Sequence, residues 1–166
     1  VEQLRSADAQ LQDFVCALGT TLRQAGSAAA FAAIDRDLVV ALAQLARAQG
    51  ATQALVVSSV GARASSRNLY LRVKGEMEAQ IAGLGFTRVD FLHPGLLLGQ
   101  RNGPPRPGEG IAQALAPLFN PLLIGPLRQY GAISARSVAA AIVTLCGKPG
   151  SGVSRIGNGQ IQALVA

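Results

Sequence analysis

The sequence predicts an α/β protein, with a parallel sheet covered by helices on both faces. Short apolar runs, typical of buried strands, alternate along the chain with longer segments in which apolar residues recur every three or four positions. This alternation is the pattern of βαβ units, whose strands lie parallel. The composition agrees, because the chain is 49% hydrophobic but only 4% aromatic, and small aliphatic residues suit helices packed closely on a parallel sheet.

The first half of the chain supplies two expected strands and one helix. Residues 13–18 are predicted to form a strand that ends at Gly19-Thr20-Thr21. Residues 35–49 are predicted to form a helix, because their apolar side chains fall on one stripe and Gly50 provides a stop signal. A second strand, which runs into a glycine turn, is predicted within residues 54–61.

The second half continues the alternation. Residues 68–84 are predicted to form a helix, because Leu69, Val73, Met77, Ile81 and Leu84 are spaced for one buried face. A strand over residues 86–92 is expected to end at His93-Pro94-Gly95. The remaining expected elements are a loop rich in Gly and Pro over 99–108, helices over 109–118 and 134–145, and a short strand and helix within 153–165.

Length and charge limit the function classes. At 166 residues the chain is long enough for one domain with a substantial core. The net charge of +6 raises the question of a nucleic-acid partner, but thirteen of the fifteen basic residues are arginines scattered from Arg5 to Arg155, with no nucleic-acid motif. Nucleic acid is therefore not the expected partner. A solvated basic surface is the expected explanation, and an anionic dinucleotide ligand is the second.

The sequence predicts no membrane span, metal site or disulfide framework. Its apolar runs stay below the roughly 18 residues that a span needs. The chain has only two cysteines, Cys16 and Cys146, which lie far apart in the sequence and within apolar runs. We therefore expect both to be small buried residues. The first residues show no basic-then-apolar secretory signal, and we therefore expect a cytoplasmic protein.

Tyr70 and Lys74 are the residues most suggestive of chemistry. Four residues apart on a helix, they lie on the same face. A phenol has a reference pKa of about 10, and a neighbouring ammonium stabilises the phenolate, which brings proton transfer toward neutral pH. Ser58 and Ser59 stand at the carboxyl end of the preceding strand, where open α/β sheets bind ligands. The alternative for a lone Tyr-x-x-x-Lys is a solvated helix face.

Four stretches, taken in series, carry a family resemblance. They are Cys16-Ala17-Leu18-Gly19-Thr20-Thr21 with Ala25-Gly26, Val57-Ser58-Ser59-Val60-Gly61-Ala62, Tyr70-Leu71-Arg72-Val73-Lys74-Gly75-Glu76, and Pro94-Gly95-Leu96-Leu97-Leu98 followed by Arg106-Pro107-Gly108-Glu109. In their order and spacing the chain resembles the short-chain dehydrogenase/reductase superfamily, in its atypical and extended branch, and within it the TIP30-like group and its bacterial NAD(P)-binding, oxidoreductase-like relatives. The resemblance implies a Rossmann-like fold and a dinucleotide cofactor, expected as NADP(H) rather than NAD(H).

The resemblance also implies roles for individual residues. Tyr70 would be the general acid/base, and Lys74 would favour its ionisation and hydrogen-bond the nicotinamide ribose. Ser59 is the first choice for the serine that orients the substrate, and Ser58 is the second. The expected cofactor-binding residues are Leu18, Gly19, Thr20, Tyr70, Lys74, Pro94, Gly95, Leu97 and Arg106. The alternative for the proline and the glycines is a tight turn, and for Arg106 an exposed loop cation.

Two departures from the family pattern stand out. His93 stands before Pro-Gly where relatives commonly carry arginine, so a group that titrates near neutral pH replaces a permanent cation; we expect it to be a satisfied strand-end residue. Nothing before Asp13 resembles the Gly-x-x-Gly-x-x-Gly that holds the pyrophosphate. We therefore expect residues 1–166 to form a single NAD(P)-binding domain that lacks its N-terminal βαβ portion, with a small substrate or lid region at about 96–133.

Three functions stand as hypotheses. The first is an NAD(P)-dependent oxidoreductase with a Ser-Tyr-Lys site, acting by hydride transfer at a small carbonyl or alcohol. The second is a cofactor-binding regulatory or scaffold protein with little turnover. The third, a nucleic-acid binder, rests on net charge alone. The apolar stretch 116–127 is either an interface, as in a homodimer, or a substrate lid, and the sequence does not identify the substrate.

Overall fold

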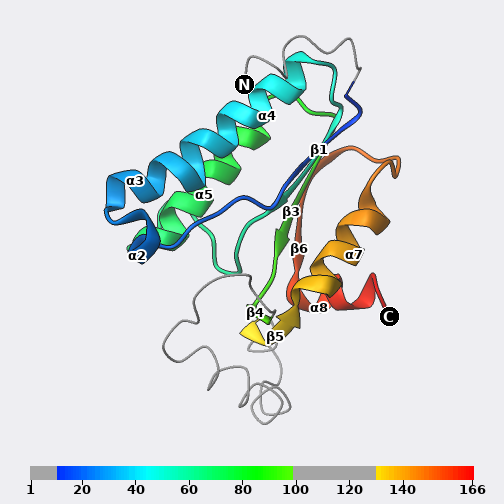
Figure 1. Cartoon of the computed structure of the whole chain (residues 1–166). Coiled ribbons are helices and arrows are strands. Elements are labelled where there is room, and N and C mark those ends of the chain that lie inside the picture. Colours follow the sequence, from blue (N-terminus) through cyan, green and yellow to red (C-terminus); the bar gives the residue numbers. More distant parts are fainter. Residues whose placement is uncertain (1–10, 99–129) are drawn as a thin grey trace.

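The computed structural model describes residues 11–98 and 130–166. The expected loop 99–108, the expected helix 109–118 and most of the expected lid region lie outside the described residues. A four-stranded sheet runs through the centre of the molecule (Figure 1). Its strands are β1 (Asp13–Cys16), β2 (Gln53–Val57), β3 (Arg88–His93) and β6 (Gly152–Gly157), in that spatial order, and each neighbouring pair is parallel. The predicted α/β class with a parallel sheet is confirmed.

The four strands are aligned at their amino-terminal ends. Asp13 pairs with Gln53, Gln53 with Arg88, and Arg88 with Gly152. Because all four strands run in one direction, their carboxyl ends and the loops that follow share one edge of the sheet. The strand predicted at 13–18 ends at Cys16, so that residues 18–20 belong to the loop at this edge.

Helices cover both faces of the sheet (Figure 1). One side carries α2 (Leu22–Ala25), α3 (Ala28–Ala32), η1 (Ala33–Leu38), α4 (Val39–Ala48) and α5 (Leu69–Ala82), and the other carries α7 (Ala135–Leu145) and α8 (Asn158–Ala163). The helices predicted at 68–84 and 134–145 correspond to α5 and α7, and the closing strand and helix to β6 and α8. None of the described helices combines the length and the apolar character needed to cross a bilayer.

The helix predicted at 35–49 begins earlier, at Ala28. The Ser27 hydroxyl accepts a hydrogen bond from the Ala30 N–H at 3.1 Å and caps the helix. α3, η1 and α4 then follow one another without a break from residue 28 to residue 48, and η1 is a π-helical stretch with a wider turn. Periodicity missed this start, because a run of alanines offers no contrast between apolar and polar positions.

The core has one part on each face of the sheet. Strands β1 to β3 pack against α4 and α5 through a cluster that includes Val40, Ala43, Val56, Met77 and Phe91. On the other face, Leu92 of β3 packs against Val138 and Ile161 of α7 and α8. A small second sheet pairs β4 (Leu96–Leu98) with β5 (Ala132–Ser134), also in parallel. Burial on both faces explains why β2 reads as a continuous apolar run in the sequence.

Candidate functional site

A cavity of about 130 Å³ opens at the carboxyl edge of the sheet, among the loop after β1, the end of β2 and the first turns of α5. Seven of the site residues predicted from the sequence line it: Leu18, Gly19, Thr20, Ser58, Tyr70, Lys74 and Leu97. Segments far apart in the chain therefore meet at the edge where open α/β sheets bind their ligands.

Tyr70 and Lys74 are positioned by helix α5. The Asn68 side chain caps this helix by accepting a hydrogen bond from the Leu71 N–H at 3.2 Å. Tyr70, in the first turn, keeps 39% of its surface exposed, and its ring lies 5.8 Å from the ring of Phe31 on α3. Lys74, one turn later, is only 4% exposed. The tyrosine is thus open to a ligand, while the lysine is enclosed.

Lys74 is paired with a residue that sequence reasoning missed. Its Nζ lies 2.9 Å from Oδ1 of Asp35 on η1, and both side chains are almost fully buried. The other carboxylate oxygen of Asp35 accepts a hydrogen bond from the Thr20 N–H at 2.8 Å. The sequence placed Asp35 only at the start of a predicted helix. One sequence signal could have identified Asp35. It stands four residues after Phe31 and four before Val39, both of which are buried, so its carboxylate falls on the buried face of the helix and needs a partner there.

The two serines after β2 have different surroundings. Ser58 is buried, lines the cavity and donates a hydrogen bond of 2.5 Å from its hydroxyl to Glu78. Ser59, the first choice from the sequence, donates to the Val60 carbonyl at 3.3 Å and does not line the cavity. The geometry therefore brings Ser58, rather than Ser59, to the same cavity as the tyrosine and the lysine.

Glu78, one further turn along α5, gathers three hydrogen bonds. Besides the Ser58 hydroxyl, Nε2 of His93 lies 2.7 Å from its carboxylate and Nε of Arg155 donates to it at 2.9 Å. Burial alone would raise the pKa of the Glu78 carboxyl, but hydrogen bonds from His93, Ser58 and Arg155 outweigh burial and hold this pKa below its ordinary value. The carboxyl is therefore ionised, and Ser58 must be the donor in their hydrogen bond.

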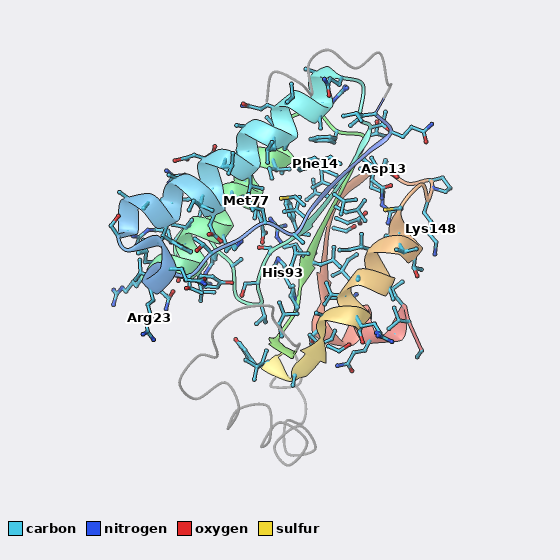
Figure 2. All side chains as sticks on the ribbon, in the orientation of Figure 1. Asp13, Phe14, Arg23, Met77, His93 and Lys148 are labelled. Atoms are coloured by element: carbon cyan, nitrogen blue, oxygen red, sulfur yellow. The ribbon has the colours of Figure 1, made fainter. Side chains whose placement is uncertain are left out.

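His93 is a partner of Glu78 rather than a free acid–base group. Figure 2 shows His93 toward the carboxyl end of the sheet, away from Asp13 at the amino-terminal end. The side chain contacts Glu78 and does not line the cavity. This placement agrees with the satisfied strand-end role that the sequence suggested.

Two other predicted cofactor contacts do not reach the cavity. The Pro94 carbonyl accepts a hydrogen bond from the Val60 N–H at 3.3 Å, and the Gly95 N–H donates to Oδ1 of Asn158 at 3.3 Å. Both residues anchor the turn after β3, and neither lines the cavity, as the tight-turn alternative requires. Arg106 lies outside the described residues.

The lining of the cavity offers both polar and apolar contacts to a ligand. The lysine and the tyrosine supply hydrogen-bond donors for hydroxyl groups. Leu18 and Leu97, which are 39% and 40% exposed, supply apolar surface. Gly19 lets the backbone approach closely, because a Cβ there would stand 3.1 Å from Oδ1 of Asp35. Within residues 11–98 and 130–166, no group of His, Cys, Asp or Glu is arranged to hold a metal ion.

Several curated proteins are similar to this chain. Protein HTATIP2 of Rattus norvegicus is 48% identical over 98 residues, which cover 59% of this chain and 40% of that protein. FMP52 of Candida albicans is 40% identical over 114 residues, or 69% of this chain and 50% of that protein. FMP52 of Debaryomyces hansenii is 31% identical over 171 residues, or 99% of this chain and 74% of that protein. The chain spans about half the length of the first two relatives.

A solved structure shares the fold. RMD from Pseudomonas aeruginosa, complexed with NADPH, matches with a TM-score of 0.66 and 18% identity, over 96% of this chain and 64% of that chain. The Rossmann-like arrangement is thereby confirmed. No family model matches the chain. The fungal relatives are named mitochondrial proteins, so the expected cytoplasmic location is wrong; it rested on the first residues of the chain alone.

Proposed function

This chain belongs to the TIP30-like family of NAD(P)-binding proteins, which includes HTATIP2 and FMP52 and is related to the short-chain dehydrogenase/reductases. On that premise, we propose that the chain transfers hydride between NADP(H) and a small carbonyl or alcohol. The convergence of Tyr70, Lys74 and Ser58 on one cavity carries the proposal. The NADPH bound to RMD supports the choice of cofactor. The names of the fungal relatives support a mitochondrial location.

In this proposal Tyr70 moves the proton. The dinucleotide, when bound, supplies or takes the hydride at the substrate carbon. In reduction, the carbonyl oxygen takes the hydroxyl proton of Tyr70 as its carbon gains hydride; in oxidation, the phenolate takes the proton of the alcohol. Lys74 lies one turn along the same helix face, where its positive charge stabilises the phenolate.

Ser58 orients a ligand and does not deliver a proton. Its hydroxyl hydrogen is directed to the ionised Glu78, so its oxygen acts as an acceptor toward any other partner. A substrate alcohol or the hydroxyl of Tyr70 can supply that hydrogen bond. Residues 18–20 and Leu97, which line the same cavity, bound the nicotinamide end in this proposal.

A cofactor-binding regulatory or scaffold protein is the second candidate, and one observation favours it. The Lys74 ammonium is paired with the Asp35 carboxylate at 2.9 Å. Because the opposite charge lies so close, the pair stabilises a nearby phenolate less than a lone ammonium does. Dinucleotide binding with slow turnover is the expected behaviour of such a protein.

The test begins with a fluorescence titration with NADPH and NADH, followed by turnover on a panel of small carbonyls and alcohols. Tyr70→Phe is expected to lower turnover by about 10²–10⁴ and to leave cofactor affinity nearly unchanged, since only the proton donor is lost. Lys74→Ala should damage both. The matched control is Tyr130→Phe, which changes the other tyrosine of the chain.

The outcomes separate the two candidates. Full turnover by Tyr70→Phe, or equal and modest losses in the Tyr70 and Lys74 variants, would contradict the assigned roles. Saturable NADPH binding without turnover on any member of the panel would favour the regulatory or scaffold role. A protein that binds neither nucleotide would refute both.

A further inference from the structure

Asn158 is a buried polar side chain outside the cavity. It is the first residue of α8 and is only 1% exposed. Its Oδ1 accepts a hydrogen bond from the Gly95 N–H at 3.3 Å, and its Nδ2 donates one to the Gly131 carbonyl at 3.0 Å. An amide carries an acceptor and a donor group, so one orientation of the side chain satisfies both partners. Leaving a buried amide unpaired is costly, which fixes Asn158 between these two backbone groups.

The two partners of Asn158 each stand directly before a strand of the small sheet. Gly95 precedes β4, and Gly131 precedes β5. Asn158 itself follows β6 of the central sheet. One side chain therefore joins both strands of the small sheet to the end of a central strand, and Figure 1 shows β4, β5 and α8 at the same end of the molecule.

The small sheet needs such an anchor. β4 and β5 pair over three residues, and an isolated two-stranded sheet is marginally stable at best. Packing holds β5, because Ile133 is 3% exposed and belongs to a buried cluster. The part of the chain that the structure describes covers β4 less well, since Leu96 and Leu97 are 49% and 40% exposed. The position of β4 therefore depends on its pairing with β5 and on the bond from Gly95 to Asn158.

Leu97 connects the small sheet to the cavity. It stands opposite Ile133 in the register of β4 and β5, and it lines the cavity with Tyr70 and Lys74. The tyrosine and the lysine are carried by α5, which packs on the central sheet. The distance between Leu97 and these two side chains is therefore set by how the small sheet is attached to the central one.

We propose that Asn158 is a positioning residue of the site: it holds the starts of β4 and β5 together and thereby sets the place of Leu97 in the cavity wall. The inference rests on the proposed function, to which it adds a residue that supports dinucleotide binding through Leu97. Asn158 does not line the cavity, so it acts through the small sheet. Without its amide, the Gly95 N–H and the Gly131 carbonyl lose their partners, and β4 is held mainly by a pairing of three residues.

Hydrogen–deuterium exchange read by mass spectrometry tests the anchor without any cofactor. Asn158→Ala is expected to speed exchange in peptides that contain residues 95–98 and 131–134 by about tenfold, the factor that corresponds to the loss of one buried hydrogen bond. Peptides of β2 should exchange as they do in the unchanged protein. Unchanged exchange of residues 95–98 would overturn the proposal. Asn158→Ser, which keeps a hydroxyl, should show the same change to a smaller degree, and it decides the question if Asn158→Ala does not fold.

Gln160→Ala is the matched control on the same helix. Oε1 of Gln160 accepts a hydrogen bond from the Gly157 N–H at 2.9 Å, so this variant weakens the start of α8 but leaves both bonds of Asn158. It should speed exchange within residues 157–163 and leave residues 95–98 unchanged. Equal effects of Gln160→Ala and Asn158→Ala on residues 95–98 would show that Asn158 acts only through the stability of α8, and would overturn the proposal.

A double-mutant cycle on NADPH affinity asks whether Asn158 acts through Leu97. Asn158→Ala and Leu97→Ala are each expected to weaken NADPH binding by about tenfold, and the double variant no more than Leu97→Ala alone. Gln160→Ala should leave the affinity unchanged. A loss from Asn158→Ala that persists in full in the Leu97→Ala background would overturn the proposal, because the amide would then act on the ligand by another route.

Failure of the proposed function is recognised separately. If the unchanged protein binds no NADPH, the oxidoreductase proposal fails, whereas the exchange measurement still decides whether Asn158 holds the small sheet. Faster exchange of residues 95–98 in Asn158→Ala, without such a change in Gln160→Ala, would then support the positioning role for a different ligand of the same cavity.

Discussion

Replacing Gly75 with alanine should destabilise the protein, although this glycine stands in the middle of helix α5. Helix propensity alone predicts that the alanine would raise the free energy of unfolding by about 1 kcal/mol. The structure predicts the opposite, because a Cβ on Gly75 would stand 2.2 Å from the backbone nitrogen of Ala64 and 2.2 Å from the carbonyl carbon of Arg63. Ordinary contacts begin at 3.4 Å, so the helix and this loop would have to separate by the difference, about 1.2 Å.

The separation is costly because the loop is bonded to the same helix. The Arg63 N–H donates to the Leu71 carbonyl at 3.0 Å. Overpacking costs about 1–3 kcal/mol, and a weakened hydrogen bond costs about 1 kcal/mol. After the gain in propensity, a net loss of about 2 kcal/mol in the free energy of unfolding remains. For a chain of this size, that loss lowers the melting temperature by about 4–8 °C.

Urea denaturation and thermal melts followed by far-ultraviolet circular dichroism measure this loss. Gly83→Ala is the matched control at the end of the same helix, where φ is −85° and the nearest atom to an added Cβ stands at 3.5 Å. It should be neutral or slightly stabilising. A Gly75→Ala protein as stable as the unchanged one would refute the argument that backbone contact, rather than propensity, decides this position.

Three further predictions concern the anchors of the site. Glu78→Gln should cost about 3 kcal/mol near neutral pH in urea denaturation. The difference in stability between the two proteins should shrink as the pH falls below 4.5, the ordinary pKa of a glutamate carboxyl. A carboxyl whose pKa is lowered in the folded state stabilises the fold above its ordinary pKa and loses that contribution when it is protonated. A stability difference that stays constant down to about pH 3 would contradict this role of Glu78. In the turnover assay, Ser58→Ala should lower the turnover rate about a hundredfold and Ser59→Ala less than about twofold. The reverse order of losses would identify Ser59 as the orienting serine. Asn68→Ala removes the cap of α5 and should lower the melting temperature by about 2–4 °C, and no change would show that the cap is dispensable.

Local sequence patterns were sufficient for most of the fold. The buried face of α5 was predicted from the spacing of Val73, Met77 and Ile81, and all three are buried in the structure. β2 was recognised because strands covered on both faces are apolar throughout. The start of the helix at Ala28 was not predicted, because the capping serine and the run of alanines that follows it show no hydrophobic periodicity.

The candidate site was predicted where its residues stand next to a local signal. Gly19 and Ser58 follow strands, and Tyr70 and Lys74 share a helix face. Asp35 and Glu78 were missed because their roles come from partners distant in the chain; Glu78, for example, bonds a serine 20 residues away. The order of preference between Ser59 and Ser58 stays a prediction; Ser58 lines the cavity, and local patterns do not decide between them, since successive side chains at a strand end point to opposite sides.

The pairing of two helices constrains how this protein can vary in length. Phe31 and Asp35 stand four residues apart on one helical segment, and they contact Tyr70 and Lys74, which stand four residues apart on α5. One residue inserted between the two paired positions of either segment would rotate the second position by about 100° relative to the first, so that the two pairs could no longer form together. Homologues of this protein are therefore expected to differ in these two helices by substitution, and to confine insertions and deletions to the loops.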